Sequence, residues 1–220
     1  MPIKKLGNWW VPLNHKLVSN IVLTEQFPCV PTLIDAWKEV LKFDVAVDIG
    51  TWIGDSTVAM SKQFTNVIGF EANPAVYQCC IQNLLDRHIT NCHVHPLGLS
   101  NISAIQPFYN KGNSTWSGWI STKETDQNHQ MIKTCKLDDL NLIGVDFLKI
   151  DVDGHEGYLL EGAKEFLKNN SPVVLCEIKI RSQLERQPLD SPNPFQILKD
   201  AGYILLQKIS KADYLFVKET

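Results

Sequence analysis

Residues Val45 to Gly54 read Val-Ala-Val-Asp-Ile-Gly-Thr-Trp-Ile-Gly, and they constrain the fold more than any other stretch of the chain. An apolar run leads to Asp48, two glycines follow, and a helical pattern starts behind them, which predicts a strand, a tight turn and a helix. Gly50 can adopt backbone angles closed to other residues and lets a ligand lie against the main chain, while Gly54 allows close packing of the helix. Two interpretations are open: a loop that binds a nucleotide cofactor, and an ordinary connection in an α/β protein.

Apolar runs and helical periods alternate after residue 32, which is typical of a parallel sheet covered by helices on both faces. Residues 1–31 contain prolines and no sustained period, so we expect an N-terminal arm, followed by a single domain at 32–220. The expected strands are 45–49, 67–70, 92–96, 145–151 and 172–178, and the expected helices are 32–43, 55–63, 74–87, 156–168 and 194–201.

The segment 97–136 interrupts this alternation with short β-like pieces at 105–109 and 131–136 and a polar loop between them. An insertion of this length is usually functional or disordered, and here we expect a substrate lid. Two final strands at 203–208 and 214–217 are joined by a short turn, which makes the last strand antiparallel. The fold class is therefore α/β, with a Rossmann-like, seven-stranded, mostly parallel sheet that ends in an antiparallel hairpin.

The charge and cysteine patterns exclude several classes of protein. The net charge of the 220-residue chain is −3 and its basic residues are scattered, so a small-molecule or glycan partner is favoured over nucleic acid. No apolar run behind Lys4 and Lys5 is long enough for a signal peptide or a membrane span, which favours a cytoplasmic protein. The six cysteines lie in apolar segments without C-x-x-C spacing, so neither a zinc site nor a disulfide framework is indicated.

The loop excludes one class of cofactor and favours another. A dinucleotide fingerprint needs a glycine where this chain has Trp52, and Asp55 at the helix start would repel a phosphate. S-adenosylmethionine suits the loop better, because it carries a sulfonium and an ammonium and no phosphate, and Asp48 would favour its cationic methionine end. Glu71 stands at the end of the second strand, roughly 20 residues after Gly50, where an acid can accept hydrogen bonds from ribose hydroxyls. The alternative for Glu71 is a solvated strand end.

Four motifs in order resemble the FkbM family of S-adenosylmethionine-dependent methyltransferases: Asp48-Ile-Gly-Thr-Trp-Ile-Gly54, Phe70-Glu-Ala-Asn-Pro74, Leu137-Asp-Asp-Leu140 and Phe147-Leu-Lys-Ile-Asp-Val-Asp-Gly-His-Glu156. The resemblance covers about 45–178 and implies O-methylation of a hydroxyl, often on a sugar or a secondary metabolite, with S-adenosylhomocysteine as product. It implies cofactor contacts at Asp48, Gly50, Trp52, Gly54, Glu71 and Asn73. The chain departs from the family pattern at Trp52, where Asn is usual, and at Asp153, where Glu is usual.

The fourth strand carries the main catalytic candidates. Alternation places Phe147, Lys149 and Asp151 on one face, and a buried lysine needs a partner, for which Asp151 or Glu177 is the obvious residue. Lys149 is therefore either catalytic or half of a buried ion pair that only ties strands together. Asp151 is the stronger candidate, since it lies at the carboxyl end of a central parallel strand, where open α/β sheets bind ligands.

Methyl transfer to oxygen requires removal of the hydroxyl proton, and Asp151 and His155 are the candidate bases. His155 sits at an expected helix start, where the helix dipole lowers its pKa and keeps it neutral; alternatively it only hydrogen-bonds backbone. Asp151, Asp153 and His155 also have the alternation of a divalent-cation site. Further acids are not evident beyond Glu177, so no metal is predicted.

Trp116 and Trp119 lie in the insertion, and aromatic faces pack well against sugar C–H surfaces. We expect them, together with Glu177, to contact the substrate; the alternative is that the two tryptophans anchor the loop to the core.

Two other functions remain open. Lys149, Asp151, Glu177 and Lys179 form a set suited to RNA 2′-O-methylation, which the missing basic surface argues against. A non-catalytic S-adenosylmethionine-binding protein would result if Trp52 blocked the loop.

Overall fold

The first strand, turn and helix form as expected. The computed structural model describes residues 3–13, 19–110, 118–121 and 129–219. The strand β3 (Val45–Ile49) is followed by a tight loop and then by the helix α3 (Asp55–Ser61). Gly50 and Gly54 both have positive φ angles, of 81° and 93°, which supports the interpretation of this stretch as a turn that needs glycine.

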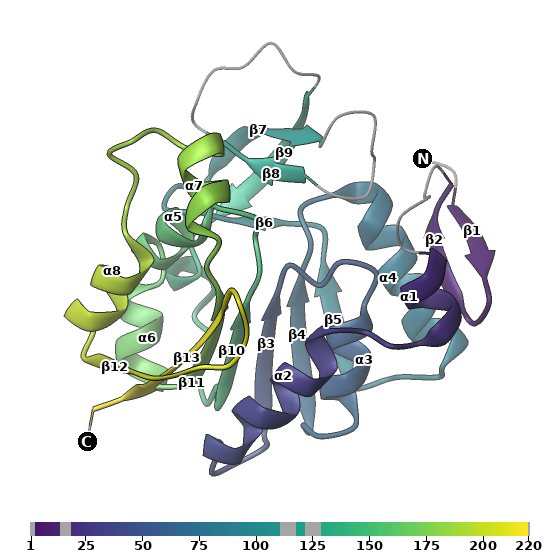
Figure 1. The fold of residues 1–220 in the computed structure, drawn as a ribbon, viewed down its shortest axis with the longest axis horizontal. Coiled ribbons are helices and arrows are strands. Elements are labelled where there is room, and N and C mark those ends of the chain that lie inside the picture. Colours follow the sequence, from purple (N-terminus) through teal and green to yellow (C-terminus); the bar gives the residue numbers. More distant parts are fainter. Residues whose placement is uncertain (1–2, 14–18, 111–117, 122–128, 220) are drawn as a thin grey trace.

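The main sheet has seven strands in the order β12-β13-β11-β10-β3-β4-β5, and only β13 runs against the others (Figure 1). This confirms the expected Rossmann-like sheet with its antiparallel C-terminal hairpin. Parallel strands of this kind are buried on both faces, which explains the continuous apolar runs. The strands besides β3 are β4 (Asn66–Phe70), β5 (Cys92–His95), β10 (Phe147–Ile150), β11 (Val173–Glu177), β12 (Tyr203–Lys208) and β13 (Asp213–Lys218).

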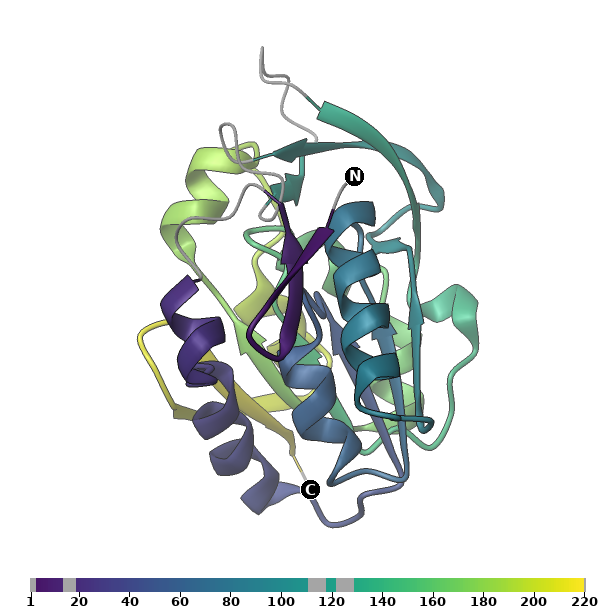
Figure 2. The same ribbon diagram turned by 90° about the vertical axis from the view of Figure 1, so that its right-hand side faces the viewer.

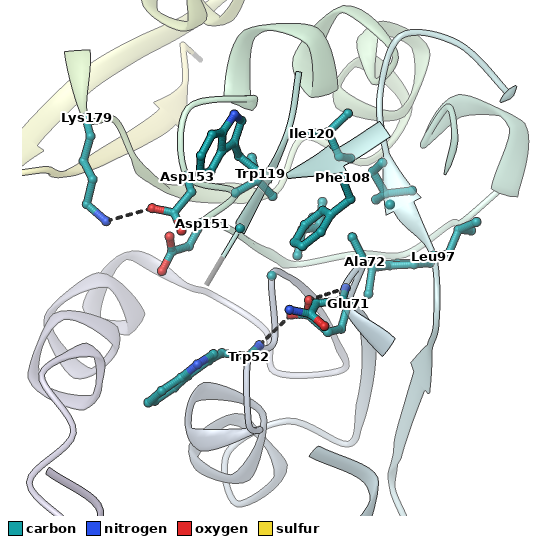
Figure 3. Close-up of a pocket in the computed structure, with 18 of the residues that line it drawn as sticks. Trp52, Glu71, Ala72, Leu97, Phe108, Trp119, Ile120, Asp151, Asp153 and Lys179 are labelled. Atoms are coloured by element: carbon teal, nitrogen blue, oxygen red, sulfur yellow. Dashed lines mark hydrogen bonds and ion pairs between the residues drawn. The ribbon is translucent and has the colours of Figure 1, made fainter. Parts of the chain in front are cut away.

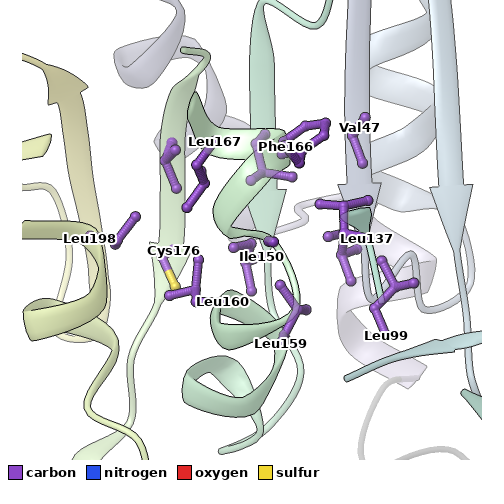
Figure 4. Packing of buried hydrophobic residues seen from close by; sticks show 14 of the residues in the cluster. Val47, Leu99, Leu137, Ile150, Leu159, Leu160, Phe166, Leu167, Cys176 and Leu198 are labelled. Carbon is purple, nitrogen blue, oxygen red and sulfur yellow. The ribbon is translucent and has the colours of Figure 1, made fainter. Parts of the chain in front are cut away.

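Helices cover both faces of this sheet. On one face, α5 (Glu156–Glu161), α6 (Lys164–Asn170) and α8 (Pro194–Asp200) pack their apolar side chains onto the strands, as Figure 4 shows for Leu159, Leu160 and Leu167. On the other face, α2 (Cys29–Ala36), the 3-10 turn Trp37–Glu39 and α3 cover Ala46, Phe147 and Leu175. A further helix, α4 (Pro74–Asp86), packs beside β5.

The helix expected at 32–43 begins at Cys29 and ends at Ala36, before the 3-10 turn. Thr32 is not its N-cap, because the Thr32 hydroxyl lies inside the helix and donates to the carbonyl of Cys29 at 2.6 Å. Pro31 occupies the first turn, where backbone N–H groups have no intrahelical partner and proline is tolerated. The proline pattern therefore misplaced the helix start.

The helix expected at 156–168 is broken into α5 and α6 around Gly162. A side chain at Gly162 would lie only 2.1 Å from the carbonyl oxygen of Ser100, so glycine at this position lets another segment approach the helix backbone. The helix α7 (Ile180–Arg186) was not expected from the sequence.

The N-terminal arm is more ordered than its composition suggested. It forms a hairpin, β1 (Ile3–Leu6) with β2 (Trp9–Pro12), and a short helix, α1 (Ser19–Thr24), and Figure 2 shows the hairpin against α4. Buried Asn83 of α4 fixes the arm, since its Nδ2 donates to the carbonyls of Trp10 and Ile53 at 3.0 and 2.8 Å and its Oδ1 accepts from the Trp10 backbone N–H. The arm is thus tied to the glycine loop through one side chain.

The insertion forms a second sheet with the order β6-β9-β7-β8, which we call the roof sheet. Its strands are β6 (Gly98–Leu99), β7 (Ala104–Asn110), β8 (Gly118–Ile120) and β9 (His129–Cys135), and it lies across the carboxyl ends of the main strands (Figure 1). The two expected β pieces correspond to β7 and β9. A 3-10 turn, Asp138–Leu140, leads back toward the main sheet. None of the described helices combines the length and the apolar character that a membrane span requires.

Candidate active site

A cavity of about 470 Å³ opens at the carboxyl ends of β3, β4 and β10, under the roof sheet (Figure 3). Its two ends differ. The Glu71 end is formed by one acid among apolar side chains: Glu71, Ala72, Leu97, Phe108 and Ile120. The Asp151 end is polar beneath an aromatic ring and consists of Asp151, Asp153, Lys179 and Trp119. Cavities of this size hold small ligands and cofactors.

Gly50 lies between the two ends, and the close approach of another segment requires it to be glycine. A side chain there would lie 1.9 Å from the carbonyl oxygen of Asp151, and the φ angle of 81° disfavours other residues. Gly54, also predicted to contact the cofactor, does not line the cavity. Its missing side chain instead allows α3 to approach Cys80 of α4, whose sulfur is 2.9 Å from the position of a Cβ.

Trp52 lines the cavity, as does Ile21 of α1. Its φ angle is 50°, in the left-handed region that non-glycine residues seldom adopt. Its backbone N–H donates to Glu71 at 2.9 Å, so the loop conformation orients that carboxylate. The indole belongs to the apolar cluster of the N-terminal arm and α4, and an open cavity remains beside it.

Glu71 is buried and held by backbone donors. Its Oε2 accepts from Trp52 and its Oε1 accepts from the N–H of Asn73 at 2.8 Å, and burial raises the pKa of Glu71 to about 7. Asn73 lines the cavity and caps α4 by accepting from the N–H of Ala75. A carboxylate oxygen has more than one lone pair, so each can accept a further hydrogen bond from a ligand hydroxyl.

Asp48 and Lys149 form a buried ion pair that does not line the cavity. The ammonium of Lys149 is 3.2 Å from Asp48 Oδ1 and donates to the carbonyl of Gly50, and the hydroxyls of Ser56 and Thr57 donate to Asp48 Oδ2. The partner of Lys149 is therefore Asp48 on the neighbouring strand, not Asp151 or Glu177. Burial by itself lowers the pKa of Lys149, but the Asp48 and Asp151 carboxylates outweigh burial and raise it, so Lys149 stays charged. Its placement fits the strand-tying alternative.

At the Asp151 end, Asp151 and Glu177 influence each other's ionisation. Burial by itself raises the pKa of Asp151, but the charge of Lys149 and a hydrogen bond from Glu177 outweigh it and hold this pKa below its usual range. Burial and the nearby Asp151 carboxylate raise the pKa of Glu177 to about 9. At neutral pH Asp151 is thus the ionised member and Glu177 the protonated one. Glu177, which we expected to contact the substrate, does not line the cavity.

Lys179 and Arg186 supply the positive charges of this end. The ammonium of Lys179 is 2.5 Å from Glu177 and 3.6 Å from Asp153, and it lines the cavity. Arg186, on α7, is paired with Asp153. The sequence suggested a role for Lys179 only as part of the set for RNA methylation. No sequence pattern predicted that Ile21 and Phe108 line the cavity, because their positions depend on how the N-terminal arm and the roof sheet pack against the main sheet.

Of the two expected lid tryptophans, Trp119 lines the cavity, and its ring stacks on Tyr109 at a centroid distance of 6.1 Å. It is nearly buried in the roof sheet, so it combines the contact with the cavity and the anchoring that we had treated as alternatives. Trp116 lies outside the described residues.

The placement of His155 does not support its assignment as a base. His155 precedes α5, is buried, and does not line the cavity. Its Nε2 is 3.0 Å from the hydroxyl of Ser100, and its ring stacks on Tyr158. Burial lowers the pKa of His155 to about 3, so the ring is neutral as expected, but burial causes this and not the helix dipole. A base must reach the acceptor, and Asp151 is the predicted base that lines the cavity. Among the described residues, no group of three or more His, Cys, Asp or Glu side chains is arranged to hold a metal ion.

Comparison with other proteins identifies the fold. Residues 48–205 match the profile of the methyltransferase FkbM domain. The structure is similar to an FkbM methyltransferase from Methylobacillus flagellatus, with 20% identity, a TM-score of 0.53, and coverage of 90% of this chain but 52% of the other, so this chain spans about half the length of that protein. It is also similar to the putative methyltransferase yhhF from Escherichia coli (13% identity, TM-score 0.53, 99% of both chains). An rRNA methylase from Streptococcus thermophilus resembles it as well (13% identity, TM-score 0.51, 87% of this chain and 97% of the other). No curated protein matches the sequence.

Proposed function

Since the chain belongs to the FkbM methyltransferase family, we propose that it transfers a methyl group from S-adenosylmethionine to a hydroxyl of a saccharide or a small metabolite. Methyltransferase activity follows from the family, and the methyltransferase fold implies S-adenosylmethionine as the methyl donor. The choice of oxygen as the acceptor atom rests on one observation: the ionised carboxylate of Asp151 lines the same cavity as Glu71.

The Glu71 end fits the nucleoside part of S-adenosylmethionine. Glu71 can accept hydrogen bonds from ribose hydroxyls, and the apolar side chains of Leu97, Phe108 and Ile120 suit a flat adenine ring. Gly50 lines the cavity, and its lack of a side chain lets the backbone carbonyl of Asp151 approach the loop after β3. Asp48 supports this site indirectly, because its ion pair with Lys149 holds the carbonyl of Gly50 beneath the cavity.

The Asp151 end fits a hydroxylated acceptor. Bound S-adenosylmethionine supplies an electrophilic methyl group on a sulfonium, and transfer of that group to a hydroxyl oxygen releases the hydroxyl proton. Asp151 is placed to receive this proton, since Lys149 and Glu177 keep it ionised. The rings of Trp52 and Trp119 border the cavity on different sides, and flat apolar surfaces beside carboxylates suit the C–H faces and hydroxyls of a sugar.

Calorimetry and label transfer test the proposal. We expect S-adenosylhomocysteine, the product form of the donor, to bind with one-to-one stoichiometry, and labelled S-adenosylmethionine to pass its methyl group to members of a panel of saccharides and hydroxylated metabolites. Methyl esters formed on acceptors with carboxylates but no hydroxyls would contradict O-methylation of hydroxyls. Binding without transfer to any acceptor would favour a non-catalytic protein, for which Trp52 was the sequence argument.

RNA 2′-O-methylation is a second candidate, because Asp151, Glu177 and Lys179 do meet at one end of the cavity. Lys149, the fourth member of the set, is instead buried against Asp48 and lies off the cavity. The net charge of −3 also offers little attraction to a polyanion. Retention of the protein on RNA at physiological salt, followed by label transfer to ribose, would favour this candidate over the saccharide.

A further inference from the structure

Two consecutive residues at the end of α7 connect the floor of the cavity to its roof. We propose that Arg186 and Gln187 form a clamp that holds strand β8 of the roof sheet against the loop after β10, and that Arg186 is thereby a positioning residue for the Asp151 end. The consequence for catalysis rests on the proposed function, whereas the clamp itself does not.

On the floor side, Arg186 holds the turn that follows Asp151. Its Nη1 donates to the backbone carbonyl of Asp153 at 2.6 Å and lies 3.2 Å from the carboxylate of the same residue. Asp153 has a φ angle of 55° and Gly154 one of 104°, so the chain makes a left-handed turn there. Aspartate tolerates this conformation better than most residues, but it remains unfavourable without support. A guanidinium that binds both the carbonyl and the carboxylate supplies that support.

On the roof side, the same two residues contact three successive positions of one chain segment. The guanidinium of Arg186 lies 4.7 Å from the centroid of the Trp119 ring, and its backbone carbonyl accepts from the hydroxyl of Ser121. Gln187 Nε2 donates to the carbonyl of Ile120 at 2.6 Å. The side chain of Arg186 is only 11% exposed and Gln187 is 1% exposed, so these contacts are shielded from water. Buried polar contacts of this kind are costly to break.

His155 extends the clamp. Its Nδ1 is 3.4 Å from Gln187 Nε2, and its Nε2 is 3.0 Å from the hydroxyl of Ser100, which directly follows β6 of the roof sheet. The loop after β10 is therefore fastened at two alternate residues, Asp153 and His155, to a unit that also fastens the roof. His155 does not line the cavity and so does not fit the role of a base, but it helps to hold the loop after β10 against the roof sheet.

The side chain of Arg186 acts on one end of the cavity, whereas Gln187 binds the carbonyl of Ile120, which lines the Glu71 end. Trp119 and Asp153 belong to the Asp151 end, whereas Glu71 is held by backbone groups of Trp52 and Asn73 that neither clamp residue contacts. Removing the Arg186 side chain should therefore disturb the acceptor and the position of Asp151 while leaving the nucleoside site intact. The effect on the acceptor and the effect on the donor can thus be separated.

The test compares R186A, R186K and Q187A with R181A. Arg181 is a matched control on the same helix, since its side chain is 90% exposed and pairs with Glu185 of the same helix. We expect hydrogen exchange in R186A and Q187A to rise at least tenfold in peptides that cover 118–121 and 151–157, with peptides of β3 and β4 unchanged. R186K should be intermediate, because lysine keeps the charge but not the paired geometry of the guanidinium.

In the same variants, R186A should raise the acceptor KM and lower kcat by roughly tenfold each, while the Kd for S-adenosylhomocysteine stays within about twofold and R181A matches the wild type in every measurement. Unchanged exchange at 118–121 and 151–157 would overturn the clamp, and so would a loss of S-adenosylhomocysteine affinity as large as the loss for the acceptor. A wild-type protein that bound no S-adenosylhomocysteine would refute the proposed function instead, and the exchange measurements would still decide on the clamp.

Discussion

The two ends of the cavity are held by different kinds of contact. At the Glu71 end, the carboxylate is oriented by backbone N–H groups of Trp52 and Asn73, which belong to the loops that directly follow β3 and β4. At the Asp151 end, the carboxylate is surrounded by side chains from β10, β11 and the roof sheet, and Glu177 together with the charges of Lys149 and Lys179 sets its ionisation. The first end thus depends on local backbone geometry, and the second depends on distant parts of the chain meeting. A substitution at one end should therefore impair the binding or chemistry of that end and leave the other end intact. The following variants test this expectation.

The largest expected effect is at the Asp151 end. In D151N the amide cannot take up the hydroxyl proton, so we expect kcat for methyl transfer to fall by roughly 100- to 10,000-fold. Calorimetry should find the Kd for S-adenosylhomocysteine within about threefold of the wild type, because Glu71 is untouched. D139N, at an exposed aspartate that accepts from Ser103 and does not line the cavity, serves as the control. A D151N enzyme with at least a tenth of wild-type kcat would show that Asp151 is not the base.

The reverse pattern is expected at the Glu71 end. E71A removes the ribose acceptor and leaves two backbone N–H groups without their partner, so S-adenosylhomocysteine should bind roughly 10- to 100-fold more weakly while the acceptor KM changes little. Burial raises the pKa of Glu71 to about 7, so wild-type affinity should fall as pH decreases through this value and the carboxylate is protonated. E71A should lose this pH dependence, and E165A, at an exposed glutamate of α6, should keep it. Weakened acceptor binding of equal size in E71A would remove the distinction between the ends.

Substitution of Trp119 and of Phe108, two aromatic residues of the roof sheet, allows a direct comparison of the two ends. W119A should raise the acceptor KM roughly tenfold and leave the Kd for S-adenosylhomocysteine nearly unchanged, because Trp119 lies over the Asp151 end. F108A should show the opposite, because Phe108 lies at the Glu71 end. Steady-state kinetics and calorimetry on both variants check this. Parallel losses of donor and acceptor affinity in W119A would mean that Trp119 only anchors the roof sheet.

The smallest effect at neutral pH is expected for E177Q. Glutamine resembles the protonated glutamic acid and can still donate to Asp151, so activity at pH 7 should stay within about threefold of the wild type. In the wild type, Glu177 loses its proton as pH rises through about 9, and the repulsion between two carboxylates should then disturb Asp151 and lower the rate. The pH–rate profile of E177Q should lack this alkaline decline. An identical decline in both proteins would assign it to another group.

The clearest sequence-based successes concern residues close together in the chain. The strand, turn and helix at Val45 to Gly54 formed as expected, as did the seven-stranded sheet with its antiparallel hairpin. Glu71 and Asn73 line the cavity because the end of β4 carries them there. In each case the signal was local: apolar periodicity, glycine at a turn, or an acid after a strand.

The errors concern contacts between distant segments. The helix expected at 156–168 is broken around Gly162, where the carbonyl of Ser100 comes so close that a side chain would not fit, and periodicity cannot reveal a contact between segments so far apart in the chain. Lys149 was assigned to Asp151 or Glu177, but its partner is Asp48 on the adjacent strand, and strand order cannot be read from periodicity. His155 stands at the helix start as expected, yet Ser100 and Gln187 enclose it and keep it off the cavity.

The sequence by itself determined which elements form and which loops carry glycines and acids, because backbone preference and apolar periodicity act over a few neighbouring residues. It also placed Asp151 at the end of a central strand, where such sheets bind ligands. Only the tertiary structure decided which acid is ionised, which histidine is enclosed and which arginine joins the roof to the floor. Burial and charge pairing set these properties, and both depend on residues tens or hundreds of positions apart that meet only after the strands have found their order.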